Sequence, residues 1–285
     1  MVGLSSCSIH SSWQCISEKC TAHVPYAWGN ILEWLQNSAT VEGWVESFLC
    51  EAMEAVQVAS LTQQISCKKA DIPIKTSKLA EILSNDWLSD DQIDFILSVI
   101  CDTQISPSTK VLGNSLVHCS SIQHKVSQEM LLTGATHLVF PFCHVRHWVA
   151  VQVDFSEEHS ITIYNSPHHP QSSMEKHLLL IVKGILQSPS KEWKVLYDVN
   201  SPKQSDGSSC GIATVNAIHQ LLCPEVDVWD LMKPLKERAY YFTQCINSFC
   251  QVCFSVIYLL IKNASFPDRP TSAEGSRWGK QHQWL

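Results

Sequence analysis

The chain has 285 residues, enough for one sizeable domain with an extension or for two small domains. Its 45% hydrophobic and 16% charged residues fit a globular protein with a large core and argue against a fibrous or disordered chain. A formal net charge of −7, with lysine and arginine scattered along the sequence, argues against a nucleic-acid-binding domain, which usually carries a basic face.

The cysteines indicate a reducing environment. Their number, 13, is odd, and residues 1–10 show neither the basic nor the apolar region of a secretory signal. Without export, the thiols are expected to stay reduced, and most of them to act as small buried hydrophobes. We therefore expect an intracellular protein, in the nucleus or the cytoplasm.

Residues 1–75 are predicted to form a serine- and cysteine-rich start followed by a helical extension. Apolar residues recur at helical spacing from Trp28 to Leu35 and from Trp44 to Val56, which predicts two amphipathic helices. The residues 37–40 between them have the composition of a turn. The apolar faces of both helices need a partner, and the main domain could supply it.

The main domain is predicted to span residues 76–262. Its first clear signal is a capping box, in which Ser89 is the N-cap and Gln92 follows three residues later. An apolar stripe then predicts a helix, through Ile93, Ile96, Leu97 and Ile100.

The sequence becomes β-prone from residue 137. Apolar runs predict strands at 138–142, 148–155, 161–164 and 194–199, and the polar link 156–160 joins the second and third into an antiparallel hairpin. Pro141 indicates an edge or a strand end. A helix is predicted at 211–222, closed by Pro224. Helices, then strands, then helices indicate an α+β domain.

The C-terminal part allows two interpretations. Ala239–Ile261 contains no charged residue and is long enough to span a bilayer, but polar residues interrupt it, which favours a buried core helix over a membrane span. The tail 263–285 is rich in proline, serine, glycine and glutamine, and we expect it to be disordered.

One group of residues has the composition of a thiol catalytic site. Cys210 begins the predicted 211–222 helix, where the helix dipole and unpaired N–H groups favour the thiolate. A hairpin turn centred near Ser156 would set His147 opposite Asn165, which brings an imidazole against an orienting amide. Cys, His and Asn can act as nucleophile, base and orienting group, although their chain order here is the reverse of the papain order.

Two further residues near the cysteine fit this chemistry. Gln204 can place an amide N–H₂ beside the nucleophile as an oxyanion donor. Gly211 would let the backbone turn and leave room for a substrate. His144 is the alternative base, three residues before His147.

These residues carry a resemblance to a known family. His147-Trp148, Asn165-Ser166 and the run from Gln204 to Cys210-Gly211 resemble the ubiquitin-like protease family, which includes the SUMO (sentrin) proteases and adenain. The family pattern is His-Trp at a strand start, Asp or Asn further on, and then Gln-x-x-x-x-x-Cys-Gly. The run 87–93 also resembles the Trp-Leu-x-Asp-x-x-Ile segment that opens this catalytic domain. The resemblance extends from about Ser84 to Leu222 and favours His147 over His144, since Trp148 follows it.

The resemblance implies an α+β, papain-like fold of the ubiquitin-like protease and adenain type, and a cysteine peptidase. Trp87 and Trp148 would roof a narrow tunnel that admits the Gly-Gly tail of a ubiquitin-like modifier such as SUMO. Cys210 would attack the carbonyl after glycine and form a thioester, near the oxyanion donor Gln204. No cofactor or metal is needed, the partners would be the modifier or its conjugates, and the oligomeric state is open.

Three positions depart from the family pattern. Asn165 stands where Asp is usual, Ser209 precedes the nucleophile in place of Asp, and Asp206 replaces an Asn two residues after the glutamine. Because Asn cannot stabilise the imidazolium by charge, a weakly active or inactive member that binds a modifier is an alternative. A related Cys-His acyl transferase is another.

Two cysteine groups raise the question of a metal site. Cys250-x-x-Cys253 has zinc-like spacing but lacks a second pair, so a core role is favoured. A small zinc knuckle near the N-terminus is the other candidate, but the spacing of its ligands matches no common pattern: Cys7, Cys15, Cys20 and His23.

Overall fold

A computed structural model describes residues 26–58, 64–65, 73–103, 108–114, 134–156, 159–164, 172–186, 192–198, 201, 204, 206–226 and 233–263, without the side chains of 26–28, 57–58, 102–103, 186 and 249–263. The chain divides into two units, Met1–Cys250 and Gln251–Leu285. All of the packing described below lies within the first unit.

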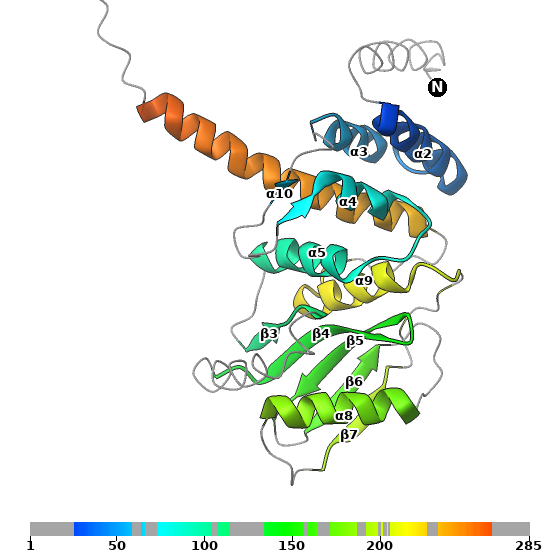
Figure 1. Cartoon of the computed structure of the whole chain (residues 1–285), viewed down its shortest axis with the longest axis vertical. Coiled ribbons are helices and arrows are strands. Elements are labelled where there is room, and N and C mark those ends of the chain that lie inside the picture. The colour runs from blue at the N-terminus through cyan, green and yellow to red at the C-terminus, as the bar shows by residue number, and fades with distance from the viewer. Residues whose placement is uncertain are drawn as a thin grey trace, which may run out of the picture. The chain divides into compact units, whose positions relative to one another are not determined.

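Helices come first along the chain (Figure 1). The elements before the large sheet are α2 (Tyr26–Glu42), α3 (Glu46–Val58), the paired strands β1 (Gln64–Ile65) and β2 (Ile74–Lys75), α4 (Thr76–Ala80), the 3₁₀ turn η1 (Glu81–Leu83) and α5 (Asp90–Thr103).

A five-stranded sheet follows, in the order β3-β4-β5-β6-β7. Its elements and the last helices are β3 (Thr109–Val111), β4 (His137–His144), β5 (His147–Asp154), β6 (Ser160–Tyr164), α8 (Ser172–Leu186), β7 (Lys194–Tyr197), α9 (Cys210–Leu222) and α10 (Pro234–Asn263). Strands β4, β5 and β6 pair antiparallel, while β3 and β7 pair parallel with their neighbours. The predicted α+β class is confirmed.

Alternation along β5 separates two cores. Trp148 and Ala150 belong to a cluster with α5 and α9, whereas Val149, Val151 and Val153 face the cluster beneath α8. Figure 1 accordingly shows α5 and α9 on one side of the sheet and α8 on the other. Because successive strand side chains point to opposite faces, one valine-rich strand supplies both cores.

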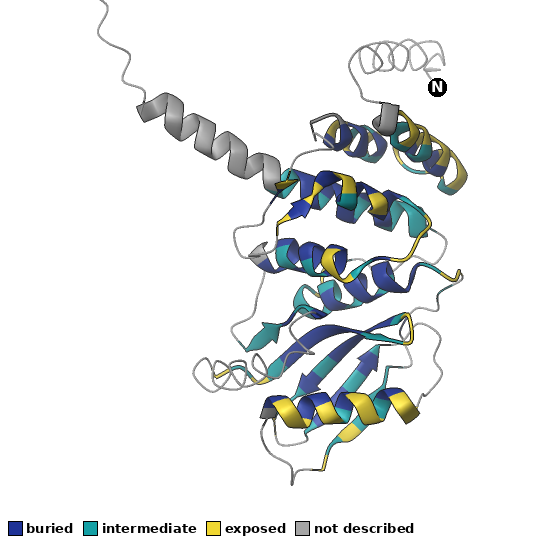
Figure 2. Ribbon diagram, viewed as in Figure 1, coloured by how far each residue is buried: buried dark blue, intermediate teal, exposed yellow. Residues whose placement is uncertain are grey.

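Helix α8 was not among the predicted elements. Its buried side chains recur at helical spacing, which was an available signal in the sequence: Met174, Leu178, Ile181, Val182 and Ile185. Figure 2 shows this buried face against the sheet and an exposed face outside. The helix supplies the crossover that the parallel pair β6 and β7 requires.

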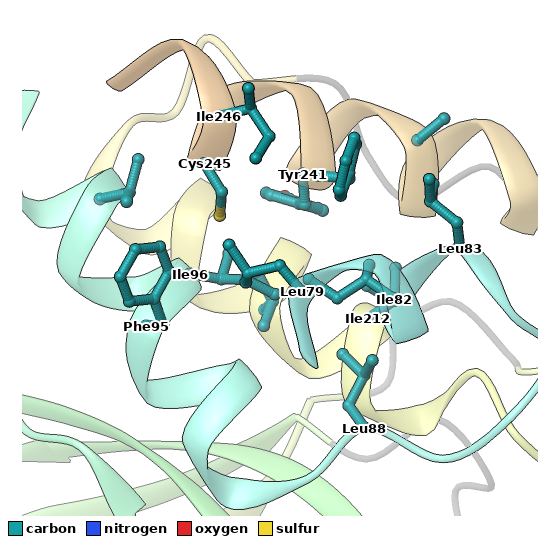
Figure 3. Close-up of a cluster of buried hydrophobic side chains, with 14 of the residues drawn as sticks. Leu79, Ile82, Leu83, Leu88, Phe95, Ile96, Ile212, Tyr241, Cys245 and Ile246 are labelled. Carbon is teal, nitrogen blue, oxygen red and sulfur yellow. The ribbon is translucent and has the colours of Figure 1, made fainter. Parts of the chain in front are cut away.

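The larger core lies between α10, α4, α5 and α9 (Figure 3). Tyr241, Cys245 and Ile246 of α10 are buried there, beside Leu79 and Ile96. The predicted core helix is therefore correct for the part of α10 whose side chains are described. Within the described residues, no helix is long and apolar enough to cross a membrane.

The N-terminal helices contact the main domain. Side chains of α2 and α3, including Leu35 and Ala52, are buried in the same core. The carboxylate of Glu42, the last residue of α2, accepts hydrogen bonds from the backbone N–H groups of Leu235 (3.0 Å) and Lys236 (2.9 Å). These N–H groups lie in the first turn of α10, where they lack partners within the helix.

Two local predictions were wrong. Residues 37–40 do not form a turn, because α2 continues to Glu42 and buries Ser38 and Ala39; the chain turns instead at Gly43, with a positive φ of 63°. The β5–β6 register differs by two residues, since Tyr164 rather than Thr162 lies opposite Ala150. A shift of two keeps every side chain on its predicted face.

Half of the predicted capping box is confirmed, but the prediction for Pro141 was wrong, because it lies inside an inner strand rather than at an edge or a strand end. The Gln92 side chain accepts the backbone N–H of Ser89 at 2.7 Å, which is one half of the predicted box. Strand β4 is an inner strand, but β3 pairs only with His137–Val139, so Pro141 lies beyond the paired segment. Its missing N–H therefore breaks no described bond to β3.

Candidate active site

A tight turn fixes the start of β5. Val145 and Arg146 alone connect β4 to β5, and both have positive φ angles, 49° and 63°. Two-residue hairpin turns of this kind normally use Asn-Gly, and a β-branched residue at positive φ is strained. The turn sets His147 as the first residue of β5, opposite His144.

Cys210 is the first residue of α9, and its side chain is 1% exposed. Burial raises the pKa of the Cys210 thiol, while the backbone N–H groups of Trp148 and Gly211 act in the opposite direction. The N–H groups at the helix start favour the thiolate as predicted, but burial outweighs them, so the pKa is raised overall. The contact with Trp148 brings the sulfur next to the His147-Trp148 pair.

A pocket of about 390 Å³ opens beside this pair. It is lined by Trp87, Leu88, Asp90, Cys143, Arg146 and Trp148. The indole N–H of Trp148 donates to the carbonyl of Leu88 at 3.1 Å, and Trp87 is 50% exposed at the pocket. The structure thus brings both predicted substrate-binding tryptophans to one pocket.

His144 is engaged elsewhere. Its Nε2 lies 3.1 Å from the Ser173 hydroxyl of α8, and its ring lies 6.2 Å from that of His177 on the same helix. Burial lowers the pKa of His144, and a charge on His177 would lower it further. His147 directly precedes Trp148, whose backbone N–H meets the thiol, and it stays the predicted base.

Comparison with known proteins places this geometry in a family. Residues 86–244, more than half of the chain, match the model described as the Ulp1 protease family, C-terminal catalytic domain. The chain belongs to the Ulp1 protease family. A comparison with curated proteins found no match.

Solved structures of Ulp1 proteases share the fold. The SUMO protease Ulp1 with its catalytic cysteine oxidised to a sulfenic acid matches with a TM-score of 0.56 at 16% identity, over 72% of this chain and 95% of that one. The C-terminal Ulp1 domain in complex with Smt3, the yeast orthologue of SUMO, matches with 0.54 at 15% identity, over 72% and 96%. The Ulp1-like SUMO protease domain of Chaetomium thermophilum matches with 0.53 at 15%, over 72% and 90%.

Gly211 has a different role from the predicted one. A Cβ at this position would lie 2.9 Å from Cβ and 3.2 Å from Cγ of Leu88. The glycine is buried in the helix and its φ is not positive, so neither a special turn nor space for a substrate explains it. Its missing side chain lets the first turn of α9 pack directly on the segment that carries Trp87 and Leu88.

The loop before Cys210 is organised by Asp206. Its Oδ1 accepts the backbone N–H groups of Ser208 (2.8 Å) and Ser209 (2.7 Å) and the side-chain amide of Gln204 (3.1 Å). Its Oδ2 accepts the Ser209 hydroxyl at 2.6 Å. Burial alone would raise the pKa of Asp206, but these hydrogen bonds outweigh it and hold the pKa below its usual value.

Two of the three departures from the family pattern thus contact each other. The carboxylate of Asp206 accepts a hydrogen bond from the hydroxyl of Ser209. Sequence reasoning treated Asp206 and Ser209 as separate changes. Their spacing of three residues, which is typical of a side chain closing a turn, was the available signal.

The remaining predicted site residues fall outside the described part of the chain. Asn165 lies there, and the described pairing of β6 ends one residue before it, at Tyr164. The side chains of the five cysteines considered for zinc and that of His23 also lie there. The catalytic roles of His147, Asn165, Gln204 and Cys210 stay predictions.

Proposed function

We propose that this chain is a cysteine peptidase that cleaves after the C-terminal Gly-Gly of a ubiquitin-like modifier such as SUMO, in deconjugation or in processing. The observation that carries the proposal is the position of Cys210. Its thiol lies at the start of a helix, against the backbone of the His147-Trp148 pair and beside a pocket walled by Trp87 and Trp148. The proposed catalytic domain spans residues 76–262 and acts inside the cell.

The chemistry is acyl transfer through a thioester. His147 takes the Cys210 proton as the sulfur attacks the carbonyl carbon of the terminal glycine. It returns the proton to the departing amine as the C–N bond breaks. Water then cleaves the thioester and restores the thiol. Because burial raises the pKa of the Cys210 thiol, attack needs a base at neutral pH, which is the role given to His147. Asn165 would orient the imidazole and Gln204 would stabilise the oxyanion.

The burial of the nucleophile supports a Gly-Gly substrate. The Cys210 side chain is only 1% exposed and the nearby pocket is lined by Trp87 and Trp148, so a thin chain reaches the sulfur more easily, and glycine has no side chain to obstruct it. A modifier tail ending in Gly-Gly fits this limit. The proposal assigns no cofactor and no metal to the reaction.

A mechanism-based probe tests the proposal. Ubiquitin-like modifiers carrying a C-terminal vinyl sulfone should form a covalent adduct with the folded wild-type chain. Cys210→Ala should lose the adduct, whereas Cys223→Ala, at the other end of α9, should keep it. A folded chain that no probe in a panel of modifiers labels at Cys210 would contradict the peptidase.

The sequence leaves two other functions open. Asn165 and Ser209 favour a module that binds a modifier without cleaving it, which predicts saturable binding of the unmodified modifier and no adduct. An acyl transferase would use the same Cys-His pair and would form an acetyl-thioester at Cys210 with acetyl-coenzyme A. Intact-mass measurement separates these outcomes.

A further inference from the structure

Arg238 of α10 is a buried cation that the proposed reaction does not use. Its side chain is 1% exposed, and burial lowers the pKa of Arg238, while negative charge on Asp206, Cys210 and Asp86 acts in the opposite direction. A buried guanidinium is costly unless its donors are satisfied and negative charge lies nearby. We therefore expect the Arg238 hydrogen bonds to have a function that an apolar side chain could not provide.

The guanidinium joins two segments that are far apart in sequence. Nη1 donates to the carbonyl of Ile82 at 3.1 Å, and Nη2 donates to those of Asp86 (2.9 Å) and Ser208 (3.2 Å). Asp86 immediately precedes Trp87 of the pocket wall, and Ser208 lies two residues before Cys210. One planar group therefore sets the spacing between the pocket wall and the nucleophile.

Other contacts also hold these two segments. Trp148 donates to the carbonyl of Leu88, and Gly211 lies against the Leu88 side chain. Asp206 gathers the N–H groups of Ser208 and Ser209 and the amide of Gln204. The carbonyl of Ser208 is thereby presented to Arg238, and its N–H to Asp206.

We propose that Arg238 is a positioning residue of the active site: its guanidinium fixes the Trp87 wall against the nucleophile loop, and Asp206 holds that loop in the shape the guanidinium binds. Arg238 touches no substrate atom. It acts through Ser208 on the placement of Cys210, and through Asp86 on Trp87. The proposal concerns the same site as the proposed peptidase and rests on that function only for its turnover measurements.

Two substitutions at Arg238 separate charge from geometry. Arg238→Lys keeps the cation but lacks the planar fork that reaches three carbonyls. Arg238→Gln removes the positive charge, whose interaction with an ionised Cys210 is favourable. On the loop, Asp206→Asn leaves an oxygen for the backbone N–H groups but cannot accept the Ser209 hydroxyl and the other donors together. Lys236→Gln, on the same helix, is the matched control, because its backbone N–H to Glu42 is retained.

The first measurement needs no modifier. Alkylation of Cys210 by iodoacetamide is followed by site-resolved mass spectrometry from pH 6 to 10, on chains shown to be folded by circular dichroism. The Cys143 thiol is another titratable group that acts on this sulfur. We expect Arg238→Gln to slow alkylation about 10-fold at pH 7, the effect of losing one neighbouring opposite charge. Arg238→Lys and Lys236→Gln should stay near the wild-type rate.

The second measurement uses turnover of a modifier with a C-terminal fluorogenic amide. Arg238→Lys should lower kcat at least about 10-fold and raise KM, since nucleophile and wall both move. Asp206→Asn should lower kcat with little change in KM, because only the loop is altered. Wild-type alkylation in Arg238→Gln, or wild-type kcat in Arg238→Lys, would overturn the proposal.

The outcomes distinguish this proposal from the proposed function. If the wild type cleaves no modifier, the peptidase fails, and the alkylation series still decides the role of Arg238. If Arg238→Gln does not fold, the Asp206→Asn variant provides the test, because Asp206 is exposed and its replacement should not prevent folding. An unchanged kcat in Asp206→Asn would overturn the proposal. If the wild type shows no turnover, an unchanged alkylation profile in Asp206→Asn would overturn it.

Discussion

Replacing Gly211 by alanine tests the close packing beneath the nucleophile. An added Cβ would lie 2.9 Å, 3.2 Å and 3.3 Å from Cβ, Cγ and Cδ1 of Leu88. The nearest of these atoms is next to the Leu88 backbone, so the contact cannot be relieved by rotating a flexible end. Either α9 or the segment carrying Trp87 and Leu88 must move.

Two opposing effects set the size of the change. Overpacking a dense core typically costs about 1–3 kcal/mol. Replacing glycine by alanine inside a helix gains up to about 1 kcal/mol, and less in the first turn, where Gly211 lies. We therefore expect Gly211→Ala to lower the free energy of unfolding by about 1–2 kcal/mol. Turnover by the proposed peptidase should fall by more than the loss of folded protein explains, because the segment that moves carries the pocket wall.

Urea unfolding followed by tryptophan fluorescence measures the stability change. Gly29→Ala is the matched control, since it makes the same substitution in α2 with no atom within 4 Å of the new Cβ. It should be neutral or stabilise by up to about 1 kcal/mol. Leu88→Ala should be destabilising by itself, because Leu88 is buried, but it should remove the clash in the double variant.

The double-mutant cycle gives the decisive result. Gly211→Ala and Leu88→Ala should be less destabilising together than the sum of the two alone, because they share one contact. Additive effects, or a Gly211→Ala chain as stable as the wild type, would refute the packing argument.

Three more predictions concern charged and ionisable groups. Glu42→Gln should lower the free energy of unfolding by about 1 kcal/mol in urea titrations, because the first-turn N–H groups of α10 lose a charged acceptor; an unchanged value would contradict this cap. The pKa of Asp206 lies below its usual value, so its contribution to stability is present above about pH 4 and is lost as pH falls through the folded-state pKa. Wild-type stability should therefore fall more steeply than that of Asp206→Asn below about pH 4, and parallel curves would contradict it. Because burial raises the pKa of the Cys210 thiol, its alkylation rate should still be rising above about pH 8.5, and a plateau reached by pH 7 would argue against the buried resting state.

Local sequence signals determined much of the fold and the outline of the site. The Ser89–Gln92 cap, the valine-rich β5 and the apolar face of α9 each follow from the spacing of neighbouring residues. The His147-Trp148 pair and the Cys210-Gly211 pair could be recognised because the two residues of each pair are adjacent in the sequence. Such patterns are local, and a sequence displays them directly.

Other features depended on long-range packing. Residues 37–40 have turn composition, yet they continue α2 because burying Ser38 and Ala39 outweighs local propensity. The resting state of the Cys210 thiol is also set by the fold: a helix start favours the thiolate, but the surrounding core reverses the direction of the pKa shift.

The sequence by itself determined which residues could carry the chemistry, and the tertiary structure decided how they are held. Arg238 lies 30 residues from Ser208 and 152 from Asp86, so no local pattern could connect it with the nucleophile loop or the pocket wall. The sequence shows Gly211 next to the cysteine, but the reason for a glycine there is its contact with Leu88, which is distant in the sequence. Hydrogen bonds and close contacts between distant segments exist only once the chain has folded.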